Sequence, residues 1–241
     1  MKLTIGHLYP QLLNLYGDRG NIICMVQRLQ WRGIEAEVKE FDLNDEIDFS
    51  ELDIVLLGGG SDREQLLVCN RLRTIKEDFL HYVECGGVVL AICGGYQLLG
   101  TSYKMGDETI EGLGVVQIHT ERGDERLVGN IVLQSDLFPL PIVGFENHGG
   151  RTFIGNYEPL GKVLSGHGNH DNAVNEGIQY KHVIGTYLHG PLLPKNPHLC
   201  DYLLQLALNR RYGQVELMPL DDQDELKANH YIVEHFTRTD L

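Results

Sequence analysis

The sequence Ala91-Ile92-Cys93-Gly94-Gly95 has the pattern of a tight turn between a strand and a helix. It begins at the end of an apolar run, residues 88–92, and leads into a helical pattern at residues 96–99. The residues two positions before and two positions after the cysteine are both small. A strand-to-helix turn that exposes a nucleophile brings neighbouring backbones together, so only small residues fit at these two positions. We therefore interpret Cys93 as a nucleophile on such a turn.

The turn also gives the cysteine a reactive setting. Cys93 is expected at a helix N-terminus, where the helix dipole and free N–H groups favour the thiolate over the thiol. The amide of Gly94 is expected to point to the place where a tetrahedral oxyanion forms. The alternative is a buried structural cysteine, and this is the role we expect for the cysteines without small flanking residues: Cys24, Cys69, Cys85 and Cys200.

Strand-like and helix-like segments alternate along the first hundred residues, on the N-terminal side of this turn. Apolar or alternating runs at 5–9, 34–39, 53–57 and 88–92 are separated by helical patterns at 20–32 and at 61–84, the latter with a break near Asn70. Continuous apolar strands that alternate with helices indicate a parallel sheet buried on both faces. The fold class predicted is α/β, a doubly wound and mostly parallel sheet flanked by helices.

The second half of the chain is richer in glycine and short strands. We expect strands at residues 113–118, 126–133, 141–146 and 183–188, and a helix at 199–208. One domain over residues 1–213 is the simplest organisation. Residues 214–241 are acidic and are expected to form a C-terminal tail or helix, which either contacts the domain or a partner or is solvated.

Composition excludes several classes of protein. The formal net charge of −14 and a pI of about 5.1 argue against nucleic-acid or anionic-membrane partners, which favour basic surfaces. No apolar run is long enough to span a membrane, and the first residues lack the layout of a signal peptide. The five cysteines are odd in number and form no CxxC motif, so neither a disulfide framework nor a zinc site is expected. A reducing, cytoplasmic location is therefore expected.

Three glycines, Gly58-Gly59-Gly60, follow the apolar run at 53–57. The loop lacks the lysine of the GxxxxGK[ST] pattern and is therefore not a phosphate-binding loop. One interpretation is a tight turn between a strand and a helix. The other is a second backbone amide that meets the amide of Gly94 to complete an oxyanion hole.

A cysteine nucleophile needs a general base, and the chain has eleven histidines. His189 follows the predicted strand at 183–188, and open α/β sheets place their chemistry at such strand ends. His148 is the main rival. We expect incidental roles for the histidines in glycine-rich or polar stretches, His119, His167, His170 and His182. A metal site built on His167 and His170 lacks a third ligand by spacing, so no metal is expected.

The motif around the nucleophile, residues 92–98, and Tyr187-Leu188-His189-Gly190-Pro191 resemble class I glutamine amidotransferases of the cobyric acid synthase (CobB/CobQ-like) type. This resemblance implies a flavodoxin-like sheet. Further motifs resemble the glutaminase subunits of bacterial lipid II isoglutaminyl synthases, and they lie at residues 15–21, 58–65, 111–114 and 144–152. The resemblance extends from about residue 3 to residue 213.

The resemblance implies a reaction and a partner. Cys93 would attack the side-chain amide of L-glutamine, ammonia would leave, and a glutamyl thioester would be hydrolysed. The ammonia would pass to a Mur-ligase-like synthase subunit of the MurT type. That partner would use ATP and Mg to amidate D-glutamate of lipid II to D-isoglutamine during peptidoglycan synthesis. No cofactor is expected on this chain.

The resemblance also assigns roles to individual residues. Arg126 would hold the α-carboxylate of glutamine, for which a guanidinium has a suitable geometry; the alternative is a surface arginine on a strand. Gly60 and Gly94 would donate the oxyanion-hole hydrogen bonds.

One departure from the family pattern concerns the third catalytic residue. Many class I glutaminases have glutamate two positions after the histidine, and here Pro191 occupies that position. Either the cysteine and histidine act as a dyad or a distant carboxylate orients the histidine. The candidates are Asp18 and Glu146, and Asp18 is preferred because its loop follows the first strand.

Three other functions remain open at this stage. The chain resembles glutaminases of other synthases, such as those that amidate cobyrinate. Those enzymes usually carry an ATP-binding synthase domain on the same chain, whereas we expect this chain to be a stand-alone subunit. A cysteine hydrolase or peptidase on a similar sheet is a second possibility. A silent binding or regulatory subunit is a third, and an intact Cys93, His189 and glycine loop argue against it.

Overall fold

A computed structural model describes residues 1–105, 108–171 and 173–237 of the chain. Its first sheet has six strands in the order β11 (Ile178–Tyr180), β12 (Val183–Thr186), β4 (Val88–Ile92), β3 (Ile54–Leu57), β1 (Lys2–Leu8) and β2 (Glu35–Phe41). All neighbours are parallel except β11 and β12. The predicted α/β fold with a mostly parallel sheet is confirmed for this part of the chain.

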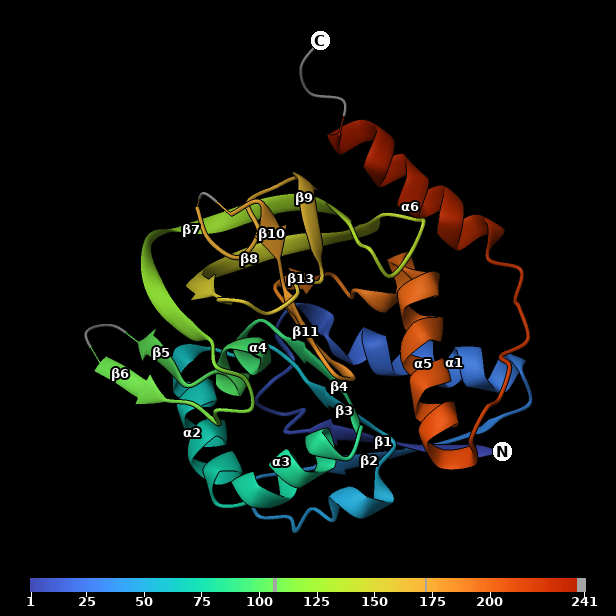
Figure 1. Cartoon of the computed structure of the whole chain (residues 1–241), viewed down its shortest axis with the longest axis horizontal. Coiled ribbons are helices and arrows are strands. Elements are labelled where there is room, and N and C mark those ends of the chain that lie inside the picture. Colours follow the sequence, from blue (N-terminus) through green and yellow to red (C-terminus); the bar gives the residue numbers. More distant parts are fainter. Residues whose placement is uncertain (106–107, 172, 238–241) are drawn as a thin grey trace.

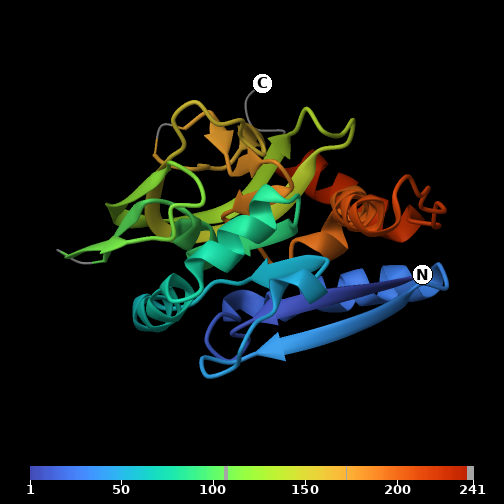
Figure 2. The same cartoon turned by 60° about the horizontal axis from the view of Figure 1, so that its bottom comes forward.

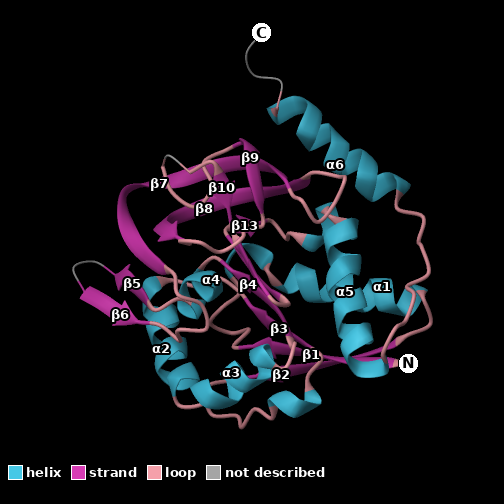
Figure 3. Ribbon diagram, viewed as in Figure 1, coloured by secondary structure: helices cyan, strands magenta, loops and turns pink. Residues whose placement is uncertain are grey.

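Helices cover both sides of this sheet (Figures 1 and 3). On one side lie α1 (Arg19–Trp31) and α5 (Pro197–Tyr212), and on the other lie α2 (Asp62–Arg73) and α3 (Lys76–Glu84). Every residue of β3 and β4 is buried, as expected for central strands between two helical layers. The long helical pattern breaks at Thr74 and Ile75 rather than near Asn70. Short turns of 3-10 helix occur at Leu15–Gly17, Phe49–Glu51 and Leu193–Lys195.

A second, mostly antiparallel sheet was not predicted as a separate unit. It contains β5 (Ser102–Met105), β6 (Glu108–Glu111), β7 (His119–Gln134), β8 (Ile142–Phe153), β9 (Gly161–Ser165), β10 (Asn175–Glu176) and β13 (Leu188–His189). The predicted strands at 126–133 and 141–146 are parts of β7 and β8. Figures 1 and 2 show β7 and β8 on the opposite side of the molecule from β1 and β2.

The predicted strand at residues 113–118 is wrong, because this segment is a loop. Its apolar residues are buried, yet its amides do not join a sheet. Leu113, Gly114 and Val116 donate instead to carbonyls at the end of α4 (Gly94–Leu99) and at Gly100. The last carbonyls of a helix lack intrahelical partners, and this loop satisfies them.

The chain crosses between the two sheets at the segment that precedes His189. The predicted strand at 183–188 divides at Tyr187, with β12 in the first sheet and β13 paired with β8 in the second. The crossing lies at the carboxyl ends of the parallel strands, which also carry the loops after β3 and β4. Residues from both sheets therefore meet at this edge.

The C-terminal segment ends in helix α6 (Gln223–Phe236), and residues 238–241 of the predicted acidic tail lie outside the described residues. Arg28 holds this segment to the domain. Its buried guanidinium donates to Asp201 on α5 and to Asp222 just before α6, at 2.6–2.9 Å. Within the described residues, no helix combines the length and apolar character needed to cross a membrane.

Candidate active site

Cys93 occupies a strained turn between β4 and α4. Its backbone has φ 51° and ψ −105°, a conformation that non-glycine residues rarely adopt and that is common at functional sites. The small neighbours are required as predicted: a Cβ on Gly95 would lie 2.6 Å from the carbonyl oxygen of Leu57. A Cβ on Gly94 would lie 2.0 Å from the side-chain nitrogen of Gln65. The turn therefore presents the thiol at the end of the central strand.

His189 and Asp18 form a fully buried pair beside the cysteine. The Nδ1 atom of His189 lies 3.3 Å from a carboxylate oxygen of Asp18, and since a carboxylate only accepts, Nδ1 donates. Burial lowers the pKa of His189, but hydrogen bonds to Asp18 and to Cys93, together with their negative charge, raise it to about 10. The structure thus brings three predicted site residues into one chain of contacts, Asp18 to His189 to Cys93.

The glycine loop packs directly against this chain of contacts. The amide of Gly59 donates to the other carboxylate oxygen of Asp18 at 2.8 Å. A Cβ on Gly59 would lie 3.1 Å from Cε1 of His189 and 3.2 Å from Cβ of Cys93. Gly60 follows and lines the same cavity as Cys93. Gly94 begins α4, where first-turn amides have no partner within the helix. The next amide, that of Gly95, donates to the carbonyl of Gly58 at 3.1 Å, which joins the start of α4 to the glycine loop.

A cavity of about 640 Å³ opens over the cysteine. Arg126 of β7 lines it, together with Gly60 and Cys93. The guanidinium of Arg126 is oriented by Asn147, whose side-chain oxygen and carbonyl accept from it at 2.7 and 2.6 Å. The guanidinium is thus held in place in the cavity that the thiol of Cys93 also lines. Such a cavity can bind a substrate that carries a carboxylate some distance from its reactive carbonyl.

Glu146, the other candidate carboxylate, is engaged elsewhere. One of its oxygens accepts from the backbone and the ring of His167, at 2.7 and 2.8 Å, and the other accepts from the backbone of Gly168 at 3.0 Å. Glu146 also lies 3.7 Å from His148. Its carboxylate therefore fixes the loop at residues 166–168, whereas the carboxylate of Asp18 contacts His189.

The rival histidines have other environments. His148 lines the cavity, but its Nδ1 donates to the carbonyl of Gly150 at 2.8 Å and its ring stacks on Tyr187 at 3.6 Å. The rings of His119 and His170 both stack on the ring of Phe153. Across the described parts of the chain, no group of three or more His, Cys, Asp or Glu residues is arranged to hold a metal ion.

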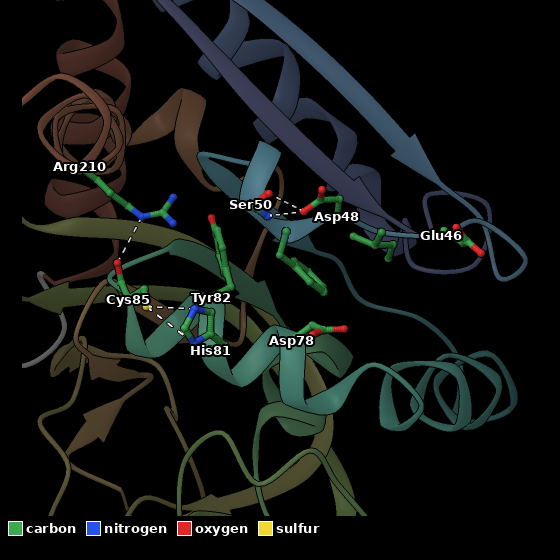
Figure 4. A pocket seen from close by; sticks show the side chains of 10 residues that line it. Glu46, Asp48, Ser50, Asp78, His81, Tyr82, Cys85 and Arg210 are labelled. Carbon is green, nitrogen blue, oxygen red and sulfur yellow. Dashed lines mark hydrogen bonds between the residues drawn. The ribbon is translucent and has the colours of Figure 1, made fainter.

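A second cavity, of about 480 Å³, contains another cysteine and histidine (Figure 4). It lies near the amino ends of β3 and β4, and Sγ of Cys85 is 3.5 Å from Nε2 of His81. Cys85 follows the last residue of α3. Arg210 contacts the carbonyl of Cys85, not its thiol. Cys85 therefore lies at a helix C-terminus and not on a strand-to-helix turn like the one that carries Cys93.

Sequence reasoning missed a set of polar side chains behind the cysteine. Gln65 donates to Gln97 at 3.0 Å, and Gln97 donates to the hydroxyl of Tyr187 at 3.1 Å. Tyr187 is also hydrogen-bonded to Thr152 at 2.6 Å. The one available signal was Gln97, which lies one helical turn after the nucleophile. These contacts join α2, α4 and the chain crossing before His189.

Residues 4–197 match the CobB/CobQ-like glutamine amidotransferase domain, and the chain belongs to this family. More specifically, it is 46% identical to the Lipid II isoglutaminyl synthase (glutamine-hydrolyzing) subunit GatD of Staphylococcus aureus, with 98% of this chain and 97% of the relative covered. The identity to GatD of Streptococcus pneumoniae is 42%, over 90% and 85% of the two chains. Both resemblances expected from the motifs are confirmed.

The fold comparison agrees with the family. PurLQS from Thermotoga maritima superposes with a TM-score of 0.58 at 16% identity, over 87% of this chain and 99% of that one. At this identity the likeness concerns the fold alone. A glutamine amidotransferase from Thermotoga maritima has the same fold, with a TM-score of 0.56 at 14% identity over 98% of this chain and 99% of that one.

Proposed function

We propose that the chain is the glutaminase subunit of a lipid II isoglutaminyl synthase and that it acts in the cytoplasm. It hydrolyses L-glutamine to glutamate and ammonia, with Cys93 as nucleophile and His189 as general base. The observation that carries the proposal is the contact chain from Asp18 through His189 to Cys93 beneath a cavity that Arg126 also lines.

The first half of the reaction forms a covalent intermediate. With its pKa raised to about 10, His189 already holds the proton taken from the thiol at neutral pH, and the sulfur attacks the amide carbon of glutamine. The tetrahedral oxyanion accepts hydrogen bonds from the amides of Gly60 and Gly94, and each such donor typically contributes about 3 kcal/mol to the transition state. His189 then returns the proton to the leaving nitrogen, and ammonia departs.

The second half regenerates the cysteine. Water attacks the γ-glutamyl thioester, His189 accepts a proton from the water, and glutamate leaves as the carbon–sulfur bond breaks. Asp18 keeps Nδ1 protonated, which leaves Nε2 of His189 for the sulfur and the water. Arg126 binds the α-carboxylate of glutamine throughout and so sets the position of the reactive carbonyl.

The proposed partner is a Mur-ligase-like synthase subunit of the MurT type, which forms a heterodimer with this chain. ATP and Mg bind to the partner, which activates the α-carboxyl of D-glutamate in lipid II, and ammonia from glutamine then yields D-isoglutamine. Similarity to GatD subunits over nearly their whole length supports this assignment. Co-expression should give a complex that amidates lipid II only when both glutamine and ATP are supplied.

The decisive experiment compares two thiols that each have a histidine neighbour. Cys93→Ser and His189→Ala should abolish glutamate release by the complex while circular dichroism stays native. Cys85→Ser is the matched control, because Cys85 also contacts a histidine but lies in the other cavity. An electrophilic glutamine analogue should label Cys93 alone. Wild-type glutamate release by Cys93→Ser, or labelling of Cys85 instead, rejects the proposal.

A further inference from the structure

The segment that carries His189 is anchored by a carboxylate that the proposed reaction does not use. Glu176 is fully buried, and its two oxygens bind consecutive residues at the crossing before His189. One accepts from the hydroxyl of Thr186 at 2.8 Å and the other from the backbone amide of Tyr187 at 2.6 Å. The hydroxyl of Thr186 in turn accepts from the amide of Leu188 at 3.1 Å. Three successive residues are thus fixed directly before the histidine.

The topology explains why an anchor is needed at this point. The chain passes from the second sheet to the first between β10 and β11, at Gly177, and returns from the first to the second between β12 and β13, at Tyr187. At Tyr187 the backbone leaves the pairing of β12 with β4 before it joins β8. Glu176 is the last residue of β10, so its carboxylate connects one crossing to the other.

The anchored segment also packs against residues that line the cavity over Cys93, Gln97 and His148. The ring of Tyr187 packs edge-on against Tyr96 of α4, with centroids 5.2 Å apart, and its hydroxyl accepts from Gln97. The residue two positions later, His189, must meet both Asp18 and Cys93. A tilt of the peptide at Tyr187 therefore changes the direction from which the imidazole approaches the thiol.

We propose that Glu176 is a positioning residue for the glutaminase reaction, which fixes the crossing at Thr186 and Tyr187 so that His189 is aligned with Cys93. The inference rests on the proposed glutaminase function. Because geometry errors of about 1 Å can cost about a hundredfold in rate, loss of the anchor should act on kcat. KM for glutamine should change less, since Glu176 does not line the substrate cavity.

Glutamine is the conservative replacement. Burial raises the pKa of Glu176 to about 8, although hydrogen bonds from Tyr187 and Thr186 lower it, so the side chain is mostly neutral at pH 7. In Glu176→Gln the side-chain oxygen can still accept from the amide of Tyr187, and the NH₂ group can donate to the hydroxyl of Thr186. This variant should keep at least about half of wild-type kcat, whereas Glu176→Ala should lose about 10- to 100-fold.

The matched control is a buried carboxylate at the amino end of β3, whereas the crossing at Tyr187 follows the carboxyl end of β12. Asp53 is 4% exposed and accepts from the backbone amide of Thr4 at 2.7 Å, far from the chain crossing. Asp53→Ala should lower the melting temperature, as Glu176→Ala does, but leave the kcat of the folded complex within about twofold. Equal kcat values for the two alanine variants, or an equal loss in Glu176→Gln and Glu176→Ala, overturn the positioning role.

A second readout does not depend on glutamine. The rate at which iodoacetamide alkylates Cys93, followed by peptide mass spectrometry across pH, reports how well the imidazolium of His189 stabilises the thiolate. Glu176→Ala should shift the midpoint upward by about one pH unit, toward that of His189→Ala, and Glu176→Gln should not. If the wild-type complex hydrolyses no glutamine, the proposed function fails, and the alkylation profile still decides the role of Glu176.

A further pair of variants applies if Glu176→Ala does not fold. Thr186→Val keeps the side-chain shape but removes the hydroxyl that joins Glu176 to the amide of Leu188, and Thr186→Ser keeps that hydroxyl. The valine variant should show the selective loss of kcat and the upward alkylation shift, and the serine variant should show neither. Identical behaviour of the two variants overturns the proposal.

Discussion

Replacement of Asp18 by asparagine tests the arrangement of the site with almost no change in shape. The asparagine oxygen can still accept from the amide of Gly59, which donates to Asp18 at 2.8 Å. Its NH₂ group then faces Nδ1 of His189, and two donors cannot share one hydrogen bond. The imidazole proton is displaced to Nε2, the atom that must accept the proton of Cys93.

The size of the effect can be worked from the buried pair. Both side chains are fully buried, and the two nearest atoms of Asp18 and His189 are 3.3 Å apart. Unit charges about 4 Å apart contribute about 4 kcal/mol at an effective dielectric constant of about 20. Since about 1.4 kcal/mol changes a rate tenfold, Asp18→Asn should lower kcat by about a thousandfold. KM should change little, because Asp18 does not line the cavity.

The assay is glutamate release by the complex of this chain with its proposed partner, at saturating glutamine. Glu146→Gln provides the comparison, because Glu146 is equally buried but holds His167 and Gly168. It should lose far less activity than Asp18→Asn. A loss below about tenfold in Asp18→Asn refutes the reasoning, and so does an equal loss in Glu146→Gln, which would make Glu146 the orienting carboxylate.

Arg126→Ala should raise KM for glutamine about 10- to 100-fold with little change in kcat, because the guanidinium binds the substrate and not the reacting atoms; steady-state kinetics that show the reverse would contradict this role. Gly59→Ala introduces a methyl group 3.1 Å from Cε1 of His189 and 3.2 Å from Cβ of Cys93, so kcat should fall, whereas Gly129→Ala, with no atom within 4 Å, should be silent in the same assay. The pKa of His189 is raised from 6.5 to about 10 in the folded chain, so its stabilising contribution is complete below pH 6.5 and is lost as pH rises toward about 10. Urea unfolding between pH 6 and pH 10 should therefore show a steeper decline for the wild type than for His189→Ala, and parallel declines would count against the raised pKa.

The parallel sheet could be predicted because its central strands, β3 and β4, are buried on both faces. The continuous apolar runs at 54–57 and 88–92 are stable only in the core of a folded chain of this size, and both are fully buried. The second sheet has weaker signals. In β7 most residues from Glu121 to Glu125 are exposed and charged, so no apolar alternation marks that half of the strand. At residues 113–118 a strand was predicted where the structure has a loop. This segment is apolar because it packs beneath α4, and not because it forms a strand.

The site was predictable where local geometry imposes a sequence pattern. Cys93 is identified by its small neighbours, because a larger residue at position 95 would meet the backbone of Leu57. Asp18 was preferred over Glu146 only because its loop follows the first strand, and no local sequence pattern shows which of the two carboxylates contacts His189. Their difference arises from the packing of α1 against the loop after His189, where Asn21 accepts from the amide of Leu193 at 2.8 Å. Glu176 was missed because its importance comes from two chain crossings that no local pattern records.

The position of β12 has a consequence for the synthesis of the chain. β12 pairs with β4, so the central part of the first sheet is completed by residues made long after Cys93. Asp18 and His189 are separated by 171 positions. A nascent chain that already contains Cys93 but not yet β12 therefore has neither the general base nor a finished sheet. The open edge of β4 in such a chain can pair with other chains. Incomplete products that end before β12 should be inactive and prone to aggregate, which protects glutamine from hydrolysis by unfinished copies.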